Sequence, residues 1–218
     1  MSSDTRDRLL QGTIDALRTQ GIAGVSARTI AAAAGVNQAL VFYHFGTVDE
    51  LLEAAVRRSV DLAVATYRDR FADVTSLGDL LTLGRDLHRT EQERGNVAQM
   101  AQVMAGARRS AALAAAGRYA MDSWTAEVES AVVQVLPGTP LAGLVDPRGL
   151  AQAVAAGFIG LELYDGVDPD AAAGALGALD ANGAMVAAFE ALPPMAVRAV
   201  RSRARKAVSR AAAAQGAR

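Results

Sequence analysis

Hydrophobic residues recur at helical spacing along most of the chain, and the apolar–polar alternation typical of strands is almost absent. Near the N-terminus, Leu10, Ile14 and Leu17 fall at i, i+4 and i+7. This spacing predicts a helix over 4–20, ended by Gly21 in a left-handed conformation. Alanine, the best helix former, is abundant throughout. The pattern therefore predicts an all-α protein.

Later helices are bounded by caps and prolines. The ranges predicted after residue 21 are 27–34, 38–44, 48–74, 76–94, 96–107, 109–136, 148–165, 170–192 and 195–214. Two of these starts are well marked, because Asp146 precedes Pro147 and Asp168 precedes Pro169. An acidic N-cap before a proline at the first helical position is a typical helix start.

Composition excludes several classes of protein. The chain has no cysteine, so it has no disulfide framework, thiolate nucleophile or Cys-ligated metal. It shows no secretory leader pattern and no uncharged apolar run of 18 residues. We therefore expect a cytoplasmic protein that does not insert into the membrane. The motifs of nucleotide-binding loops, zinc hydrolases and serine hydrolases are also absent, and no cofactor is predicted.

Residues 26–45 contain the most specific motif of the chain, SARTIAAAAGVNQALVFYHF. It predicts a capped helix, a glycine turn at Gly35, a second cap at Asn37 and a second short helix. Small residues such as Ala31 and Ala34 allow the helices to cross closely. The apolar residues that can fill the space between them are Ile30, Val36 and Val41. This is the layout of a helix-turn-helix, whose second helix enters the major groove of DNA.

The motif resembles that of the TetR family of regulators over residues 5–55. The family pattern IAxxAGV corresponds to Ile30–Val36, and the family pattern Y-x-HF corresponds to Phe42–Phe45. Two positions depart from the pattern. Phe42 replaces a common tyrosine, and Val48 replaces a common lysine at the start of the next helix, so two phosphate-directed groups are missing.

The resemblance implies a set of DNA contacts. Ser26 and Arg28 are expected at phosphates, Gln38, Ala39 and Leu40 at base edges, Tyr43 and His44 at the backbone or bases, and Asn37 at the cap of the recognition helix. A plain helical hairpin is the alternative interpretation. It leaves the aromatic and amide side chains of this short helix without a role, so DNA binding is favoured.

An effector site is predicted in the middle helices. The candidate ligand-binding residues are His88, Met100, Met104, Met121, Trp124 and Phe158. Thioether and aromatic groups suit an apolar or aromatic molecule, with Tyr119 and Glu91 as possible polar tips. Arg108 and Arg109 are an alternative for an anionic ligand. His88 and Glu91 share a helix face but are too few to hold a metal ion, so no metal site is predicted.

Small residues recur within 148–165 and 170–192, which allows close helix packing against a second copy of the chain. Members of the family usually dimerise through their last two main helices, so a homodimer is expected. The predicted organisation is a DNA-binding domain over 1–47, a helical ligand-binding and dimerisation domain over 48–197, and a basic helix or tail over 198–218.

The tail gathers basic residues and has no acidic ones, which leaves the rest of the chain acidic. The seven basic residues are Arg198, Arg201, Arg203, Arg205, Lys206, Arg210 and Arg218. Two interpretations remain open at this point. The tail adds positive charge to the weakly charged DNA-binding domain, or it docks on the acidic body of its own chain.

The sequence thus predicts a ligand-responsive repressor that binds a palindromic double-stranded operator as a dimer and responds to a small-molecule effector of unidentified structure. The alternative is a helical adaptor whose DNA reader is vestigial. A helical enzyme is the third class, and no motif supports it.

Overall fold

The computed structural model describes residues 2–139 and 141–216, and in these the chain forms ten α-helices and one short 3-10 helix. They are α1 (Ser2–Gly24), α2 (Ala27–Ala34), α3 (Ala39–Phe45), α4 (Val48–Ala72), α5 (Leu77–Glu93), α6 (Asn96–Gly106), α7 (Ala111–Val135), η1 (Leu136–Gly138), α8 (Pro147–Asp165), α9 (Pro169–Glu190) and α10 (Pro194–Gly216). The all-α prediction is confirmed. None of the described helices is long and apolar enough to cross a membrane.

Local capping explains where the helices begin. The predicted acidic caps are confirmed, because Asp146 accepts from the backbone N–H of Gly149 at 2.7 Å and Asp168 from that of Ala171 at 3.0 Å. The prediction for α7 began two residues early. Ser110 has an extended backbone and caps α7 through the N–H of Leu113, so the helix starts at Ala111.

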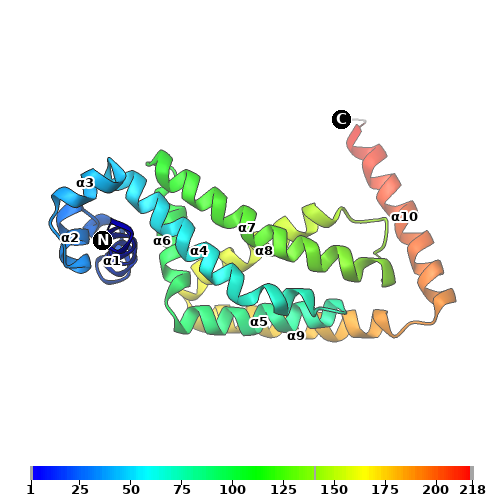
Figure 1. The fold of residues 1–218 in the computed structure, drawn as a ribbon. Coiled ribbons are helices and arrows are strands. Elements are labelled where there is room, and N and C mark those ends of the chain that lie inside the picture. Colours follow the sequence, from blue (N-terminus) through cyan, green and yellow to red (C-terminus); the bar gives the residue numbers. More distant parts are fainter. Residues whose placement is uncertain (1, 140, 217–218) are drawn as a thin grey trace.

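Helices α1, α2 and α3 form one end of the molecule together with the start of α4 (Figure 1). Their core contains Leu9, Ile30 and Val41, all fully buried, with Val36 packed against it. Leu51 and Ala55 of α4 belong to the same core. The apolar residues predicted to lie between the helices of the motif are confirmed in this core. We call helices α1 to α3 the reader, and the core of the reader extends beyond residue 47 into α4.

Helices α1 and α2 cross at very short range. A Cβ built on Gly12 would lie 2.7 Å from the backbone nitrogen of Ala34 and 2.8 Å from its Cβ. Real Cβ atoms do not approach so closely, so only glycine fits at position 12. The sequence predicted that Ala34 allows the two helices of the helix-turn-helix to cross closely; the close contact that the structure shows at Ala34 is instead with Gly12 of α1.

The remaining helices build an elongated body in which α4 and α7 pack along each other (Figure 1). Near the reader, Leu17 of α1 and Leu52 of α4 share a cluster with Val103 and Leu113. Further along, α4, α5, α7 and α8 enclose a second cluster around Phe71. Helix α1 therefore contributes to the reader's core and to the body at once.

Helix α10 lies at the end of the molecule opposite α3 (Figure 1). Arg201 donates to the carbonyl oxygen of Thr139 at 2.8 Å, and the Arg205 guanidinium lies against Gly143. The basic helix is thus held by the loop after α7. Its distance from the reader of its own chain favours docking on the body over a DNA contact by the same chain, and Arg218 lies outside the described residues.

The crossing at Gly12 yields a stability prediction. We expect Gly12→Ala to lower the free energy of unfolding by about 1–3 kcal/mol, because the added methyl group overpacks the α1–α2 contact. Gly84→Ala is the matched control, since a Cβ there meets nothing within 4 Å. That control gains helix propensity, up to about 1 kcal/mol. Urea unfolding measures both. Equal stability of Gly12→Ala and the parent would contradict the tight crossing.

Candidate functional site

The turn between α2 and α3 has the geometry that the motif predicts. Ser26 caps α2 by accepting from the N–H of Thr29 at 3.2 Å, and the Thr29 side chain accepts from the N–H of Ser26 in return. Gly35 ends α2 in the left-handed region with φ 63°. The Asn37 side chain accepts from the N–H of Ala39 at 2.8 Å, which confirms its capping role at the start of α3.

Arg8 of α1 fixes this turn from behind. Its guanidinium donates to the carbonyl oxygens of Ala34 at 2.8 Å and Gly35 at 2.7 Å. These carbonyls end α2, so they lack partners within the helix and carry the negative end of its dipole. Arg8 therefore holds α1 and the α2–α3 turn in one arrangement. From the sequence alone, this arginine counts only as part of the reader's positive charge.

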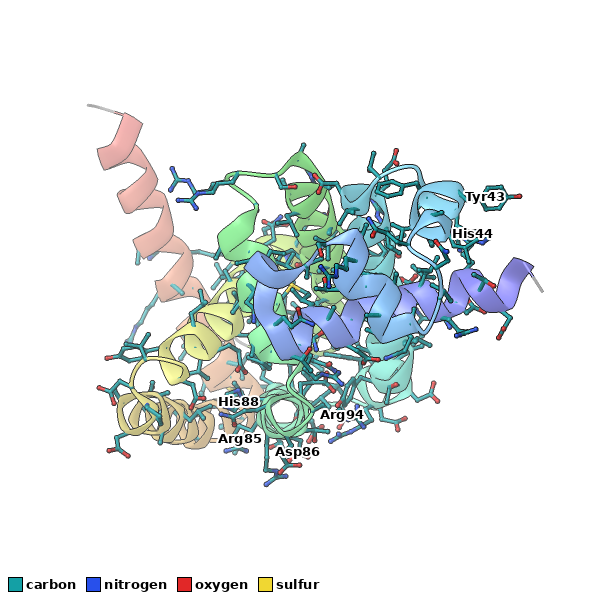
Figure 2. All side chains as sticks on the ribbon, turned by 90° about the vertical axis from the view of Figure 1, so that its left-hand side faces the viewer. Tyr43, His44, Arg85, Asp86, His88 and Arg94 are labelled. Carbon is teal, nitrogen blue, oxygen red and sulfur yellow. The ribbon has the colours of Figure 1, made fainter. Side chains whose placement is uncertain are left out.

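The predicted DNA-contacting residues lie mainly on one exposed surface. Tyr43 is 79% exposed and points away from the body (Figure 2). Ser26, Arg28, Asn37, Gln38 and Ala39 are also exposed, and His44 is half-buried with its ring edge-on to Tyr43. Leu40 differs, because its side chain packs against the reader's core and is half-buried. Leu40 thus anchors α3 and presents less surface than the sequence suggested.

The free positive charge of the reader is small. Arg8 is bound to the turn, and Arg6 lies 4.9 Å from the centre of the Phe45 ring. Arg18 of α1 and Arg28 at the start of α2 are exposed, and no hydrogen bond or ion pair to the described residues is found for either side chain. The N-terminus of α2, with Ser26 and Arg28, is therefore one part of the reader that is available to an anion.

A cavity of about 1020 Å³ runs through the helical body. Its walls are mostly apolar and come from α1 and from α4 to α9. Of the predicted ligand-binding residues, those that line it are His88, Met100, Met121, Trp124 and Phe158. Trp124 sits beside Tyr67 and Phe71, with ring centres 6.0 and 6.5 Å apart.

Met104 was predicted to line the cavity, and this is wrong. Its Sδ lies 3.3 Å from where a Cβ on Gly117 would be, so it fills the α6–α7 contact. Met100, one turn earlier, faces the cavity. Tyr119, a possible polar tip, donates to Asp61 and stacks with Arg57 outside the cavity. Arg108 and Arg109 are exposed and do not line it either.

Two buried carboxylates reach the cavity wall. Glu91 accepts from the Tyr67 hydroxyl at 2.6 Å, from Arg94 at 3.0 Å and from Asn96 at 2.6 Å. Burial is the main cause that raises the pKa of Tyr67 to about 12, and the hydrogen bond to the Glu91 carboxylate is the second cause. The hydroxyl therefore remains protonated and donates to Glu91 at any physiological pH.

Glu162 of α8 is the second carboxylate, and sequence reasoning missed it. It forms a buried ion pair with Nδ1 of His88, which lies on α5 (Figure 2). Burial raises the pKa of Glu162, and the contact with His88 opposes that rise. The separation of the partners by 74 positions leaves no local signal in the sequence. No group of three metal-ligating side chains occurs in the described part of the chain.

The reader touches the cavity directly. Ile14 and Leu17 of α1 line it, beside Met100 and Val103 of α6. The Gln102 side chain of α6 accepts from the backbone N–H of Ile22 at 2.8 Å, next to the left-handed kink at Gly21. A molecule in the cavity would therefore meet side chains of the helix that also holds the α2–α3 turn.

Comparison with known proteins adds the family. Residues 9–55 match the model described as bacterial regulatory proteins, tetR family. A TetR-family transcriptional regulator from Rhodococcus sp. is 28% identical, with a TM-score of 0.66 over 82% of this chain and 98% of that one. A regulator from Streptomyces coelicolor A3(2) is 25% identical, with a TM-score of 0.60 over 75% and 87%.

The multidrug binding protein EbrR, solved in complex with proflavin, shares the fold at 23% identity. Its TM-score is 0.56, over 80% of this chain and 99% of that one. No protein with a curated description matches the sequence.

Proposed function

The chain belongs to the TetR family of transcriptional regulators, and from that premise we propose that it is a dimeric repressor released from its operator by a small molecule. Membership makes it a DNA-binding transcriptional regulator rather than an enzyme. The observation that carries the finer proposal is the position of α1. This helix is clamped to the DNA reader through Arg8 and lines the cavity through Ile14 and Leu17.

On DNA, α3 lies in the major groove with its exposed side turned to the bases. Gln38 and Ala39 open the helix and are free of the reader's core, while Tyr43 projects furthest. A glutamine can form two hydrogen bonds with an adenine edge. Arg28 and the N-terminus of α2 bind a phosphate. Leu40 packs against the core of the reader and is half-buried, so only its exposed part can contact a thymine methyl group.

A second copy of the chain packs against α8 and α9. Near the end of α8, Leu163 is 45% and Tyr164 49% exposed, and Val167 after it is 82% exposed, although all three also border the open part of the cavity. A Cβ added at Gly157, Gly160, Gly174 or Gly177 would meet nothing within 4 Å. These two helices thus present a surface of small and apolar residues. A two-fold dimer through it would give the paired readers that a palindromic operator requires.

The effector is a lipophilic molecule that occupies the cavity. EbrR, which has the same fold, binds proflavin. The cavity here suits such a ligand, with Trp124 and Phe158 among mainly apolar walls and a volume large enough for a drug-sized molecule. Filling it shifts α6 and α1 together, because Gln102 ties α6 to the end of α1. The ligand binds the released state better than the DNA-bound state, which is the condition for release.

A helical adaptor with a vestigial reader is the alternative function. It leaves the exposed Tyr43 and Arg28 without a role, whereas DNA binding uses both. Binding to the intergenic DNA beside the chain's own gene distinguishes the two.

Substitutions in α3 test the DNA contact. We expect Tyr43→Ala to weaken operator binding and Gln38→Ala to relax base preference at one position by about 1–3 kcal/mol, because a bidentate base contact is lost. Electrophoretic mobility shift with single-base operator variants measures both effects. Leu62→Ala is the control, since Leu62 is an exposed apolar residue on α4, outside the reader. Unchanged operator affinity and base preference in both α3 variants, with normal circular dichroism, would refute this assignment.

A large side chain at Gly177 tests the dimer. Gly177 is exposed on α9, does not line the cavity and has nothing near its Cβ position, so Gly177→Trp leaves the monomer's own packing intact. We expect the variant to be folded but monomeric, and to lose operator affinity because the two readers are no longer linked. Sedimentation velocity gives the oligomeric state. A variant that remains a dimer of parental size would place the interface elsewhere.

Two methionines one turn apart test the effector site. Lipophilic aromatic compounds that release the operator should change the emission of Trp124, the single tryptophan, which lines the cavity. We expect Met100→Ala to weaken binding of these compounds by about 1 kcal/mol through lost apolar contact. Met104→Ala is the matched control, because Met104 faces Gly117 instead. Compounds that release DNA with no change in Trp124 emission and no effect of Met100→Ala would place the effector elsewhere.

A further inference from the structure

The cavity wall contains two buried polar groups without partners. The Oε2 atom of Glu162 and the Nε2 atom of Gln99 have no hydrogen-bond partner among the described residues. Their side chains come from α8 and α6, both line the cavity, and the residues are 5% and 6% exposed. A buried polar group without a partner is costly, so most such groups in proteins are paired.

The neighbouring Glu91 shows that this is a specific feature of Glu162. All three donors to Glu91 come from the protein, namely Tyr67, Arg94 and Asn96, and they occupy both carboxylate oxygens. Arg94 also balances its charge. Glu162 has His88 at Oε1 alone, and Oε2 is left for a donor from outside the described residues.

The charges that face this point favour a cation. Glu162 and Asp165 are both acidic and lie on α8, and Asp165 binds Gln92 of α5. His88 is the basic group in contact with Glu162, while Arg85 lies on the cavity rim one turn before it and contacts Thr82. The Nδ1 atom of His88 lies at Oε1, and no donor is found at Oε2 among the described residues. The surrounding walls are apolar and aromatic, and aromatic faces also attract cations.

We propose that Glu162 Oε2 binds the protonated nitrogen of an amphipathic ligand, whose N–H donates a hydrogen bond to this oxygen. The Nε2 amide group of Gln99 donates a second hydrogen bond to an acceptor atom of the same ligand. The inference rests on the proposed effector role of the cavity and specifies the ligand's class: an aromatic or lipophilic body that carries one cationic N–H group. His88 is a positioning residue, because it holds Oε1 and leaves Oε2 directed at the ligand.

A matched pair of dyes tests the proposal on the full-length chain. 9-Aminoacridine is a cation with N–H donors at neutral pH, whereas acridine has the same ring system and is mainly neutral. We expect Glu162→Gln to weaken 9-aminoacridine binding at least tenfold and to change acridine binding less than twofold, by isothermal titration calorimetry. The glutamine oxygen can still accept from His88, so this variant should retain its fold, which thermal unfolding checks.

Asp165→Asn is the matched control. It removes the same charge three residues along α8, and its side chain does not line the cavity. We expect it to bind both dyes as the parent does. Equal loss of 9-aminoacridine affinity in both variants would show a general effect of negative charge and overturn the assignment to Oε2.

Other outcomes separate this inference from the proposed function. If both dyes bind the parent and Glu162→Gln equally, the cation site is refuted while the lipophilic effector cavity stands. If neither dye binds the parent, the cation site and the cavity's effector role are both refuted. Operator binding by α3 is measured independently of either result.

Discussion

Helix α1 must pack in two hydrophobic cores at the same time, and the rest of the structure depends on this constraint. Leu9 and Ile14 pack with α2 and α3, and Leu17 packs with α4, α6 and α7. Burying a leucine or isoleucine side chain stabilises a fold by about 1.5–3 kcal/mol. The reader therefore cannot turn relative to the body without disturbing contacts in both cores. The packing of the body thus determines the orientation of the reader.

The cavity adjoins this double packing of α1. Ile14 and Leu17 border it on one side, and α8 borders it on another. Protein interiors are normally close-packed, and an apolar void weakens the contacts of every side chain around it. A ligand that fills the void restores those contacts. It can thus stabilise one arrangement of α1 over another with no direct contact to the residues that bind DNA.

Sequence reasoning succeeded where the determining interactions are local. The caps at Ser26, Asn37 and Asp146 act within three residues, and the helix-turn-helix follows from them and from Gly35. The sequence predicted less well which face of a helix a residue occupies, because residues one turn apart have similar spacing. Met100 and Met104 have the same chemistry one turn apart, and the position of α7 decides that Met100 faces the cavity and Met104 does not.

Interactions between distant residues gave no signal at all. The contact of His88 with Glu162 joins α5 to α8 across 74 positions, whereas the sequence places only Glu91 on the same helix face as His88. Arg8 likewise reads as a surface charge, although it binds carbonyls 26 and 27 residues away. Composition likewise does not say at which end of the molecule the basic α10 lies, so the sequence left both interpretations of this helix open.

The engagement of Arg6 and Arg8 bears on how this reader releases DNA. Phosphate contacts by free cations supply much of the affinity of a DNA-binding protein and fix its register on the duplex. Here two arginines are bound to Phe45 and to the turn, and the lysine common at the start of α4 is Val48. Affinity then depends more on the alignment of α3 and the α2 N-terminus in both copies of a dimer. A complete switch needs a difference in ligand affinity of about 5.5 kcal/mol between the two states. Under the proposed function, a lipophilic ligand supplies this difference itself, by packing against Ile14 and Leu17 more favourably in the released state than in the DNA-bound state.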